Sequence, residues 1–182
     1  MGFITELAVR HQLKKHGFTE ERAFVPFRGI RRAVVLFDVE DVDADECRRM
    51  AEEFFTSAGI EWRPFFLDMG KHAKDDIIVT GIKTTILRRN LAFRGTLPKE
   101  IVGELESWPA DLYICLADNG CPAVRCFSGI VPAKFCIGRC DYAGSPFLMT
   151  FTSAGSPDSI QVNFHDSVKC LKSMLEYLTK II

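Results

Sequence analysis

The sequence lacks any long apolar run. None of its 182 residues lies in a stretch that approaches the 18 or more consecutive apolar residues of a membrane span. Glu6 and Arg10 interrupt the first apolar residues, so no signal peptide is predicted. The cysteine count is odd, at seven, which is unfavourable for a framework of disulfides. Together these features predict a cytoplasmic protein with reduced thiols.

An excess of either charge is also missing. The chain has 23 Lys and Arg against 24 Asp and Glu, which gives a net charge of −1. This balance excludes the broad basic surface that binds nucleic acid without specificity, so no nucleic-acid partner is expected. With 47% hydrophobic and 26% charged residues, the composition is that of a folded globular domain.

The motifs of familiar enzyme classes are absent from the sequence. There is no G-x-G-x-x-G after the first predicted strand, no G-x-x-x-x-G-K-[ST], no G-x-S-x-G and no H-E-x-x-H. The pairs Cys121/Cys126 and Cys136/Cys140 do not have the C-x2-C spacing of zinc sites. We therefore expect no metal and no cofactor, and the sequence leaves open whether the chain is an enzyme.

Residues 1–32 form a basic segment, with seven Lys or Arg against three Glu. A helix is predicted over residues 3–16, ended by Gly17, and residues 18–30 are expected to be irregular. Apolar residues such as Leu7 and Leu13 lie on different sides of this helix and make a poor single face. The helix either packs on the domain with its lysines in solvent or binds a membrane surface or an anionic partner.

Residues 33–182 are predicted to form one domain in which strands and helices alternate. A continuous apolar run predicts a buried strand at 33–37, and further strands are predicted at 61–67, 77–79, 111–117 and 134–137. Helices are expected over 44–57, 98–106 and 122–130 and from residue 167, with Asp43 and Glu46 as a capping box and Asp166 as the last cap. Residues 147–152 and 160–164 are typical of an antiparallel hairpin. The fold class is α/β: a Rossmann-like three-layer fold with a mainly parallel sheet, this hairpin and a terminal amphipathic helix.

Several of these segments resemble a bacterial family described only as a domain of unknown function. The matching pieces are residues 34–38, 110–116 and 133–139 and the terminal helix around Tyr177. The resemblance implies a small cytoplasmic protein. Residues 111–138 are also similar to the amino-terminal half of heptosyltransferase-type glycosyltransferases, through Asp118, Gly120, Arg125, Ala133 and Ile137-Gly138. That similarity implies the fold rather than the reaction.

A ligand site is predicted at the carboxyl ends of the strands, where open parallel sheets bind their ligands. Reading each strand to its end gives Asp38, then Asp68 with Lys71 and His72, then the loop at Asp118, and finally Arg139. Asp38 has a turn residue or an arginine partner as its alternative role, and Asp118 has a helix cap. The predicted ligand-binding residues are Asp38, Asp118, Asn119, Gly120, Arg125, Arg139 and Asp141.

Three functional hypotheses follow. The absence of catalytic motifs favours a non-catalytic α/β module that binds a small ligand or a protein partner. The second is an enzyme, or a degenerate glycosyltransferase-like domain, that acts on an anionic nucleotide or sugar phosphate at this edge of the sheet. The third is a membrane-peripheral or assembly protein that uses the basic residues 1–32.

Overall fold

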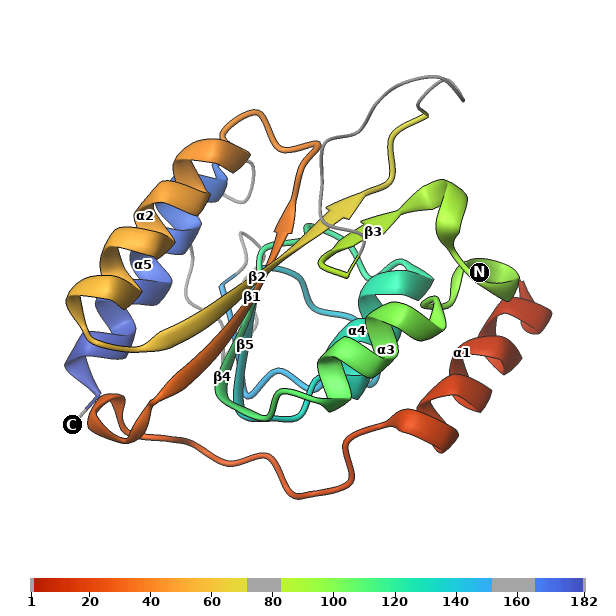
Figure 1. Ribbon diagram of the computed structural model, residues 1–182, viewed down its shortest axis with the longest axis horizontal. Coiled ribbons are helices and arrows are strands. Elements are labelled where there is room, and N and C mark those ends of the chain that lie inside the picture. The colour runs from red at the N-terminus through yellow and green to blue at the C-terminus, as the bar shows by residue number, and fades with distance from the viewer. Residues whose placement is uncertain (1, 72–82, 152–165, 182) are drawn as a thin grey trace.

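A computed structural model describes residues 2–71, 83–151 and 166–181. Its six strands form one sheet in the order β3-β2-β1-β4-β5-β6, and every neighbouring pair is parallel (Figure 1). This is the strand order of a doubly wound, Rossmann-like fold, so the predicted fold class is confirmed. The strands are β1 (Arg32–Asp38), β2 (Glu61–Asp68), β3 (Thr85–Leu87), β4 (Ala110–Cys115), β5 (Ala133–Gly138) and β6 (Met149–Thr150).

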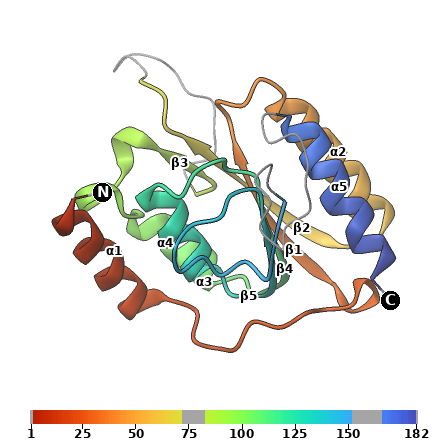
Figure 2. The same cartoon turned by 180° about the vertical axis from the view of Figure 1, so that it is seen from behind.

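Helices cover both faces of the sheet and make it the middle of three layers. Two helices, α2 (Ala44–Ser57) and α5 (Ser167–Lys180), lie on one face. The other face carries α1 (Phe3–His16), α3 (Lys99–Glu106) and α4 (Pro122–Ile130) (Figures 1 and 2). Short 3-10 turns complete the described elements: η1 (Phe27–Gly29), η2 (Arg88–Asn90) and η3 (Phe93–Gly95).

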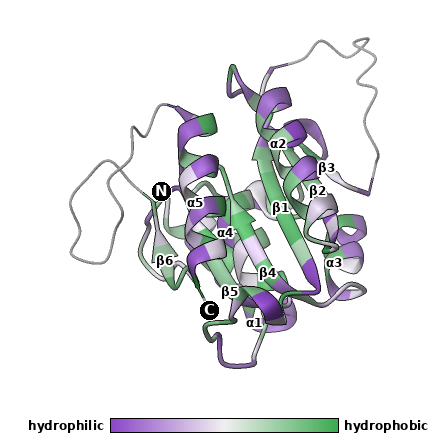
Figure 3. Cartoon of the chain, turned by 90° about the vertical axis from the view of Figure 1, so that its left-hand side faces the viewer, coloured by the Kyte–Doolittle hydropathy of each residue, from purple (hydrophilic) through white to green (hydrophobic). Residues whose placement is uncertain are grey.

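The central strands β1 and β4 are largely apolar because each contributes to two cores. In β1, Val34 and Leu36 belong to the core beneath α3 and α4, whereas Val35 and Phe37 belong to the core beneath α2 and α5. Successive side chains of a strand point to opposite faces, so a strand covered on both sides needs a continuous apolar run. β1 is green along most of its length when the chain is coloured by hydropathy (Figure 3).

The structure corrects two details of the sequence interpretation. Asp43 stands at the N-terminus of α2, but its side chain makes no capping hydrogen bond, so the predicted capping box is wrong. The C-terminal antiparallel hairpin is not confirmed: β6, in its first half, pairs in parallel with β5. The second half of that hairpin and the strand predicted at 77–79 lie outside the described residues. The cap at Asp166 is confirmed: its carboxylate accepts a hydrogen bond of 2.9 Å from the Lys169 backbone N–H.

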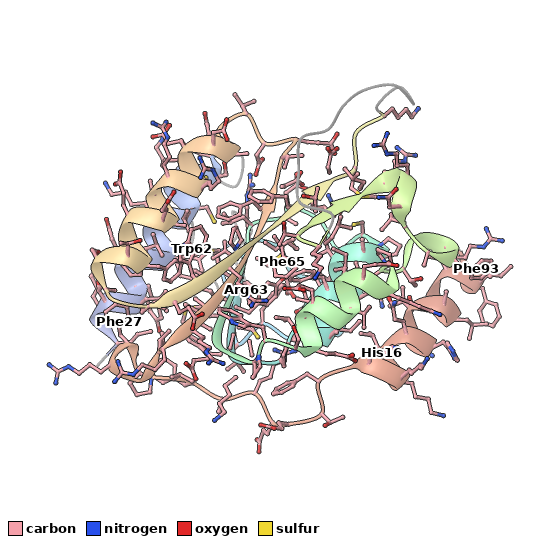
Figure 4. All side chains as sticks on the ribbon, in the orientation of Figure 1. His16, Phe27, Trp62, Arg63, Phe65 and Phe93 are labelled. Atoms are coloured by element: carbon pink, nitrogen blue, oxygen red, sulfur yellow. The ribbon has the colours of Figure 1, made fainter. Side chains whose placement is uncertain are left out.

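The basic N-terminal segment packs on the domain. Leu13 of α1 contacts Gly129 of α4, and His16 lies 2.7 Å from the carboxylate of Glu106, the last residue of α3 (Figure 4). The segment after α1 is held by Arg22, whose guanidinium donates to the carbonyls of Ser128 and Ala133 at 2.9 and 2.8 Å. No helix among the described residues is both long and apolar enough to cross a membrane.

Candidate functional site

The sheet changes direction of winding between β1 and β4. The chain leaves β1 for α2 on one face and leaves β4 for α4 on the opposite face, although the two strands are direct neighbours. In doubly wound folds the connections diverge at such a switch point and leave a crevice beyond the carboxyl ends of the strands. Asp38 ends β1 at this place, and Asp118 lies in the loop after β4.

Asp38 is a buried carboxyl group without a cation beside it. Its residue is 9% exposed, and its Oδ1 accepts a hydrogen bond of 3.1 Å from the Glu40 backbone N–H. Among the described residues no donor contacts its Oδ2. Burial above all, together with the nearby carboxylates of Asp41 and Asp118, raises the pKa of Asp38 from 3.8 to about 6, although the hydrogen bond from the Glu40 backbone N–H acts in the opposite direction. The Asp38 carboxyl group is therefore a weaker acid than an exposed aspartate, and its Oδ2 accepts no hydrogen bond from the described residues.

Arg139 is held in an ion pair with Asp41. Its Nη1 lies 2.5 Å from Asp41 Oδ2 and also donates to the Leu116 carbonyl at 3.2 Å. The arginine side chain is only 2% exposed, so it joins the end of β5 to the loop after β1 beneath the surface. Burial raises the pKa of Asp41, while Arg139 acts in the opposite direction. Arg139 therefore reaches the predicted edge, but its charge is already balanced by a partner that the sequence analysis did not assign to it.

The loop after β4 is closed by its own contacts. The Asn119 side chain donates to Asp118 Oδ1 at 2.7 Å and accepts from the Cys121 backbone N–H at 3.1 Å. The N-cap of α4 is Cys121, so Asp118 does not have the capping role considered as its alternative. Gly120 is required by packing, since a Cβ there would lie 2.7 Å from the Tyr142 ring. Asp118 and Asn119 remain exposed beyond the carboxyl end of β4.

Arg125 of α4 binds the N-terminal helix. Its two terminal nitrogens lie 2.7 and 3.1 Å from the carboxylate oxygens of Glu6. This paired geometry fixes α1 against α4 and lowers the pKa of Glu6 to about 2, chiefly through the hydrogen bonds from Arg125. The pair borders a cavity of about 410 Å³, which is lined by Glu6, Arg10, Gly120, Arg125, Tyr142 and Ala143.

The remaining predicted residues that the structure describes lie along the carboxyl edge of the sheet. Asp68 is buried at the end of β2 and accepts a hydrogen bond of 3.2 Å from the Gly70 backbone N–H. Asp141 is exposed and accepts a hydrogen bond from the Ser145 hydroxyl. Lys71 is exposed, and His72 lies outside the described residues.

The cysteines of the described residues form neither a disulfide nor a metal site. All seven cysteines are unpaired. Burial raises the pKa of the Cys121 thiol at the start of α4, so this thiol keeps its proton at neutral pH and is a weak nucleophile. Within residues 2–71, 83–151 and 166–181, no group of three or more His, Cys, Asp and Glu side chains is placed to hold a metal ion.

The switch point thus offers acceptors and little positive charge. Asp38 and Asp118 have no ion-pair partner in the described part of the chain, whereas Arg139 and Arg125 each contact a carboxylate. Burial of a carboxyl group without a cation is unfavourable, so its retention needs a reason other than stability. Comparison of the chain with protein-family models, with curated proteins and with solved structures gave no match.

Proposed function

We propose that the protein is a non-catalytic α/β module that binds a small polar ligand at the β1/β4 switch point. The observation that carries the proposal is the buried Asp38 carboxyl group, whose second oxygen has no donor among the described residues. A bound ligand would supply the missing hydrogen bond. Asp118 and Asn119 at the rim would contact the same molecule.

The charge of the crevice defines the class of ligand. Asp38 and Asp118 are acceptors when ionised, and both local arginines are engaged in ion pairs. A ligand group that donates hydrogen bonds is therefore favoured, such as the hydroxyls of a sugar or a nucleoside, or an amine. A phosphate placed directly against Asp38 is disfavoured by charge repulsion, so the phosphate of a nucleotide or sugar phosphate would have to lie farther from this carboxyl group.

The compartment belongs to the same proposal. Seven unpaired thiols are compatible with a reducing environment, and we place the module in the cytoplasm. A bacterial source is proposed only from the family resemblance of residues 34–38, 110–116 and 133–139.

A thermal-shift screen tests the proposal. The panel comprises free sugars, nucleosides, nucleotide-sugars, sugar phosphates and polyamines, each added to wild type, Asp38→Asn and Asp45→Asn. Asp45 is an exposed carboxylate in the first turn of α2 and serves as the matched control. A ligand at about a hundred times its Kd should raise the melting temperature by about 5 °C or more in wild type and in the control. The shift should be largely lost in Asp38→Asn.

The pH dependence of binding identifies the ligand class. A ligand that donates to ionised Asp38 should bind more weakly as the pH falls through about 6, because the carboxyl group then gains its proton. An anion that binds against Asp38 should show the opposite dependence. The proposal is wrong if no compound stabilises the folded wild type, or if a stabilising compound acts equally on Asp38→Asn.

A further inference from the structure

The outward face of α1 carries large apolar side chains. Phe3, Ile4 and Leu7 are 78%, 52% and 47% exposed. The opposite face of the helix is the one packed on the domain, where Val9 is fully buried and Gln12 exchanges two hydrogen bonds with the Leu97 backbone. The mixed apolar pattern of this helix thus has a structural basis: one set of apolar residues fixes the helix and the other faces outward.

A second aromatic side chain lies beside this face. Phe93 in η3 is 68% exposed, and η3 contacts α1 near its N-terminal end (Figures 1 and 4). The next residue, Arg94, has a positive φ of 59° and holds its guanidinium 5.3 Å from the centre of the Phe93 ring. Such a backbone conformation is unfavourable for a residue with a Cβ. We call Phe3, Ile4, Leu7 and Phe93 the α1 patch.

The charged residues around the α1 patch are basic. Arg10, Lys14 and Lys15 are exposed on α1, and Arg94 adjoins Phe93. The one acidic residue of α1, Glu6, is engaged by Arg125 and by Arg10. The outward face of this helix therefore combines apolar side chains with positive charge. It is complementary to a surface whose outer layer is negatively charged and whose interior is apolar.

The position of the α1 patch suits a flat partner. α1 is the outermost element at one end of the molecule, and it lies on the side opposite to α2 and α5 (Figures 1 and 2). Side chains projecting from such a rim can enter a planar interface without any movement of the fold. Helices that lie in a bilayer interface combine Phe or Leu on one side with Lys and Arg at the level of the headgroups.

We propose that the α1 patch and its basic neighbours attach the protein to the surface of an anionic membrane. Phe3, Leu7 and Phe93 would enter the boundary between headgroups and acyl chains, and the basic side chains would contact anionic headgroups. This contact is independent of the ligand site at the switch point, because none of its residues belongs to that site.

Vesicle co-sedimentation of the full chain tests this attachment. Vesicles of phosphatidylcholine alone are compared with vesicles that contain about 30% phosphatidylglycerol, at about 0.1 M and about 0.5 M salt. Wild type should bind the anionic vesicles about tenfold better than the neutral ones, and this binding should weaken at the higher salt concentration. Phe3→Ser/Phe93→Ser should reduce binding to the anionic vesicles about tenfold or more, and Lys14→Gln/Lys15→Gln should reduce mainly the preference for them.

Two controls keep the test decisive. Val42→Ser/Leu148→Ser removes two exposed apolar side chains far from α1 in the sequence and should bind like wild type. Circular dichroism and the melting temperature should be unchanged in all variants. The proposal fails if wild type does not prefer anionic vesicles, or if Phe3→Ser/Phe93→Ser binds like wild type. It also fails if wild type does not bind vesicles and the patch variants instead lose self-association or a contact with an acidic protein.

Discussion

The two sides of the switch point differ in how they treat buried carboxylates. On the side of α2 and α5, Asp41 faces the buried guanidinium of Arg139. On the side of α4, Asp38 is buried without a cation partner in the described part of the chain, and the charge of the exposed Asp118 helps to raise the pKa of Asp38. A buried charge with an ion-pair partner is explained by the fold itself, since each partner stabilises the other once both are buried. A buried carboxyl group without such a partner is the better indicator of a binding site.

The largest expected effect on stability comes from breaking the ion pair between Arg139 and Asp41. Arg139→Met removes the cation and leaves Asp41 partly buried and unpaired, which should lower the free energy of unfolding by about 3–5 kcal/mol. Urea denaturation followed by circular dichroism measures this change. In the double variant Arg139→Met/Asp41→Leu most of the loss should be recovered, because no uncompensated charge remains. An Arg139→Met protein as stable as wild type would show that the pair is not important for the fold.

Removal of the unpaired Asp38 carboxyl group should have the opposite effect and stabilise the protein. The pKa of Asp38 is raised in the folded state, so the folded protein binds more protons than the unfolded chain between about pH 4 and 6. The unfolding free energy should therefore fall as the pH rises through this window, and the penalty should be complete above about pH 6. With allowance for solvent screening, Asp38→Asn should stabilise the protein at pH 7.5 by about 1–2 kcal/mol.

Denaturation curves at several pH values measure this gain. Asp45→Asn, which changes an exposed carboxylate, should stay within about 0.5 kcal/mol of wild type. If Asp38→Asn destabilises the protein at pH 7.5, the carboxyl group has a structural partner and the contrast between the two sides is lost.

A smaller effect is expected at the contact between α1 and α4. Arg125→Met removes the hydrogen bonds that lower the pKa of Glu6, so this pKa should rise from about 2 towards its ordinary value of 4.5. Carbon-detected NMR of the Glu6 carboxyl group follows the titration. The contribution of this pair to stability is present above the ordinary pKa and disappears as the pH falls towards 2. An unchanged Glu6 titration in Arg125→Met would contradict the observed pairing.

The smallest effect on stability is expected from Asp118→Asn. Asp118 is exposed, and the stability should change by less than about 0.5 kcal/mol. However, its charge helps to raise the pKa of Asp38, so the Asp38 titration should move to lower pH in this variant. An unmoved titration would mean that the two carboxylates do not interact.

The sequence predicts the sheet well because its signal is local. The runs at 33–37 and 112–117 are apolar at every position, as expected of strands covered on both faces, and both lie in central strands or directly after them. The capping box at Asp43 and Glu46 failed although its residue types are correct. Asp43 adopts φ −105° and ψ 22°, away from the extended backbone usual for an N-cap, and its side chain makes no capping hydrogen bond.

The candidate site is predictable only in part. Asp38 follows from its place at the end of a buried strand, because strand ends meet at one edge in a parallel sheet. The partners of the arginines do not follow, since Arg139 meets Asp41 and Arg125 meets Glu6 across long stretches of sequence. Asp41 stands in an acidic run that reads equally well as a solvated helix N-terminus. Which apolar residues of α1 point outward could not be predicted from the sequence, because this depends on which face of the helix packs on the domain.

The titration of the Asp38 carboxyl group in wild type tests the central claim most directly. Carbon-detected NMR, with the resonance assigned by its loss in Asp38→Asn, should give a midpoint at about pH 6. A compound that stabilises the protein in the thermal-shift screen by donating to this carboxylate should lower that midpoint. A midpoint near 3.8 without ligand would show that Asp38 is solvated or paired. The switch point would then hold no uncompensated acceptor, and the proposed ligand site would be wrong.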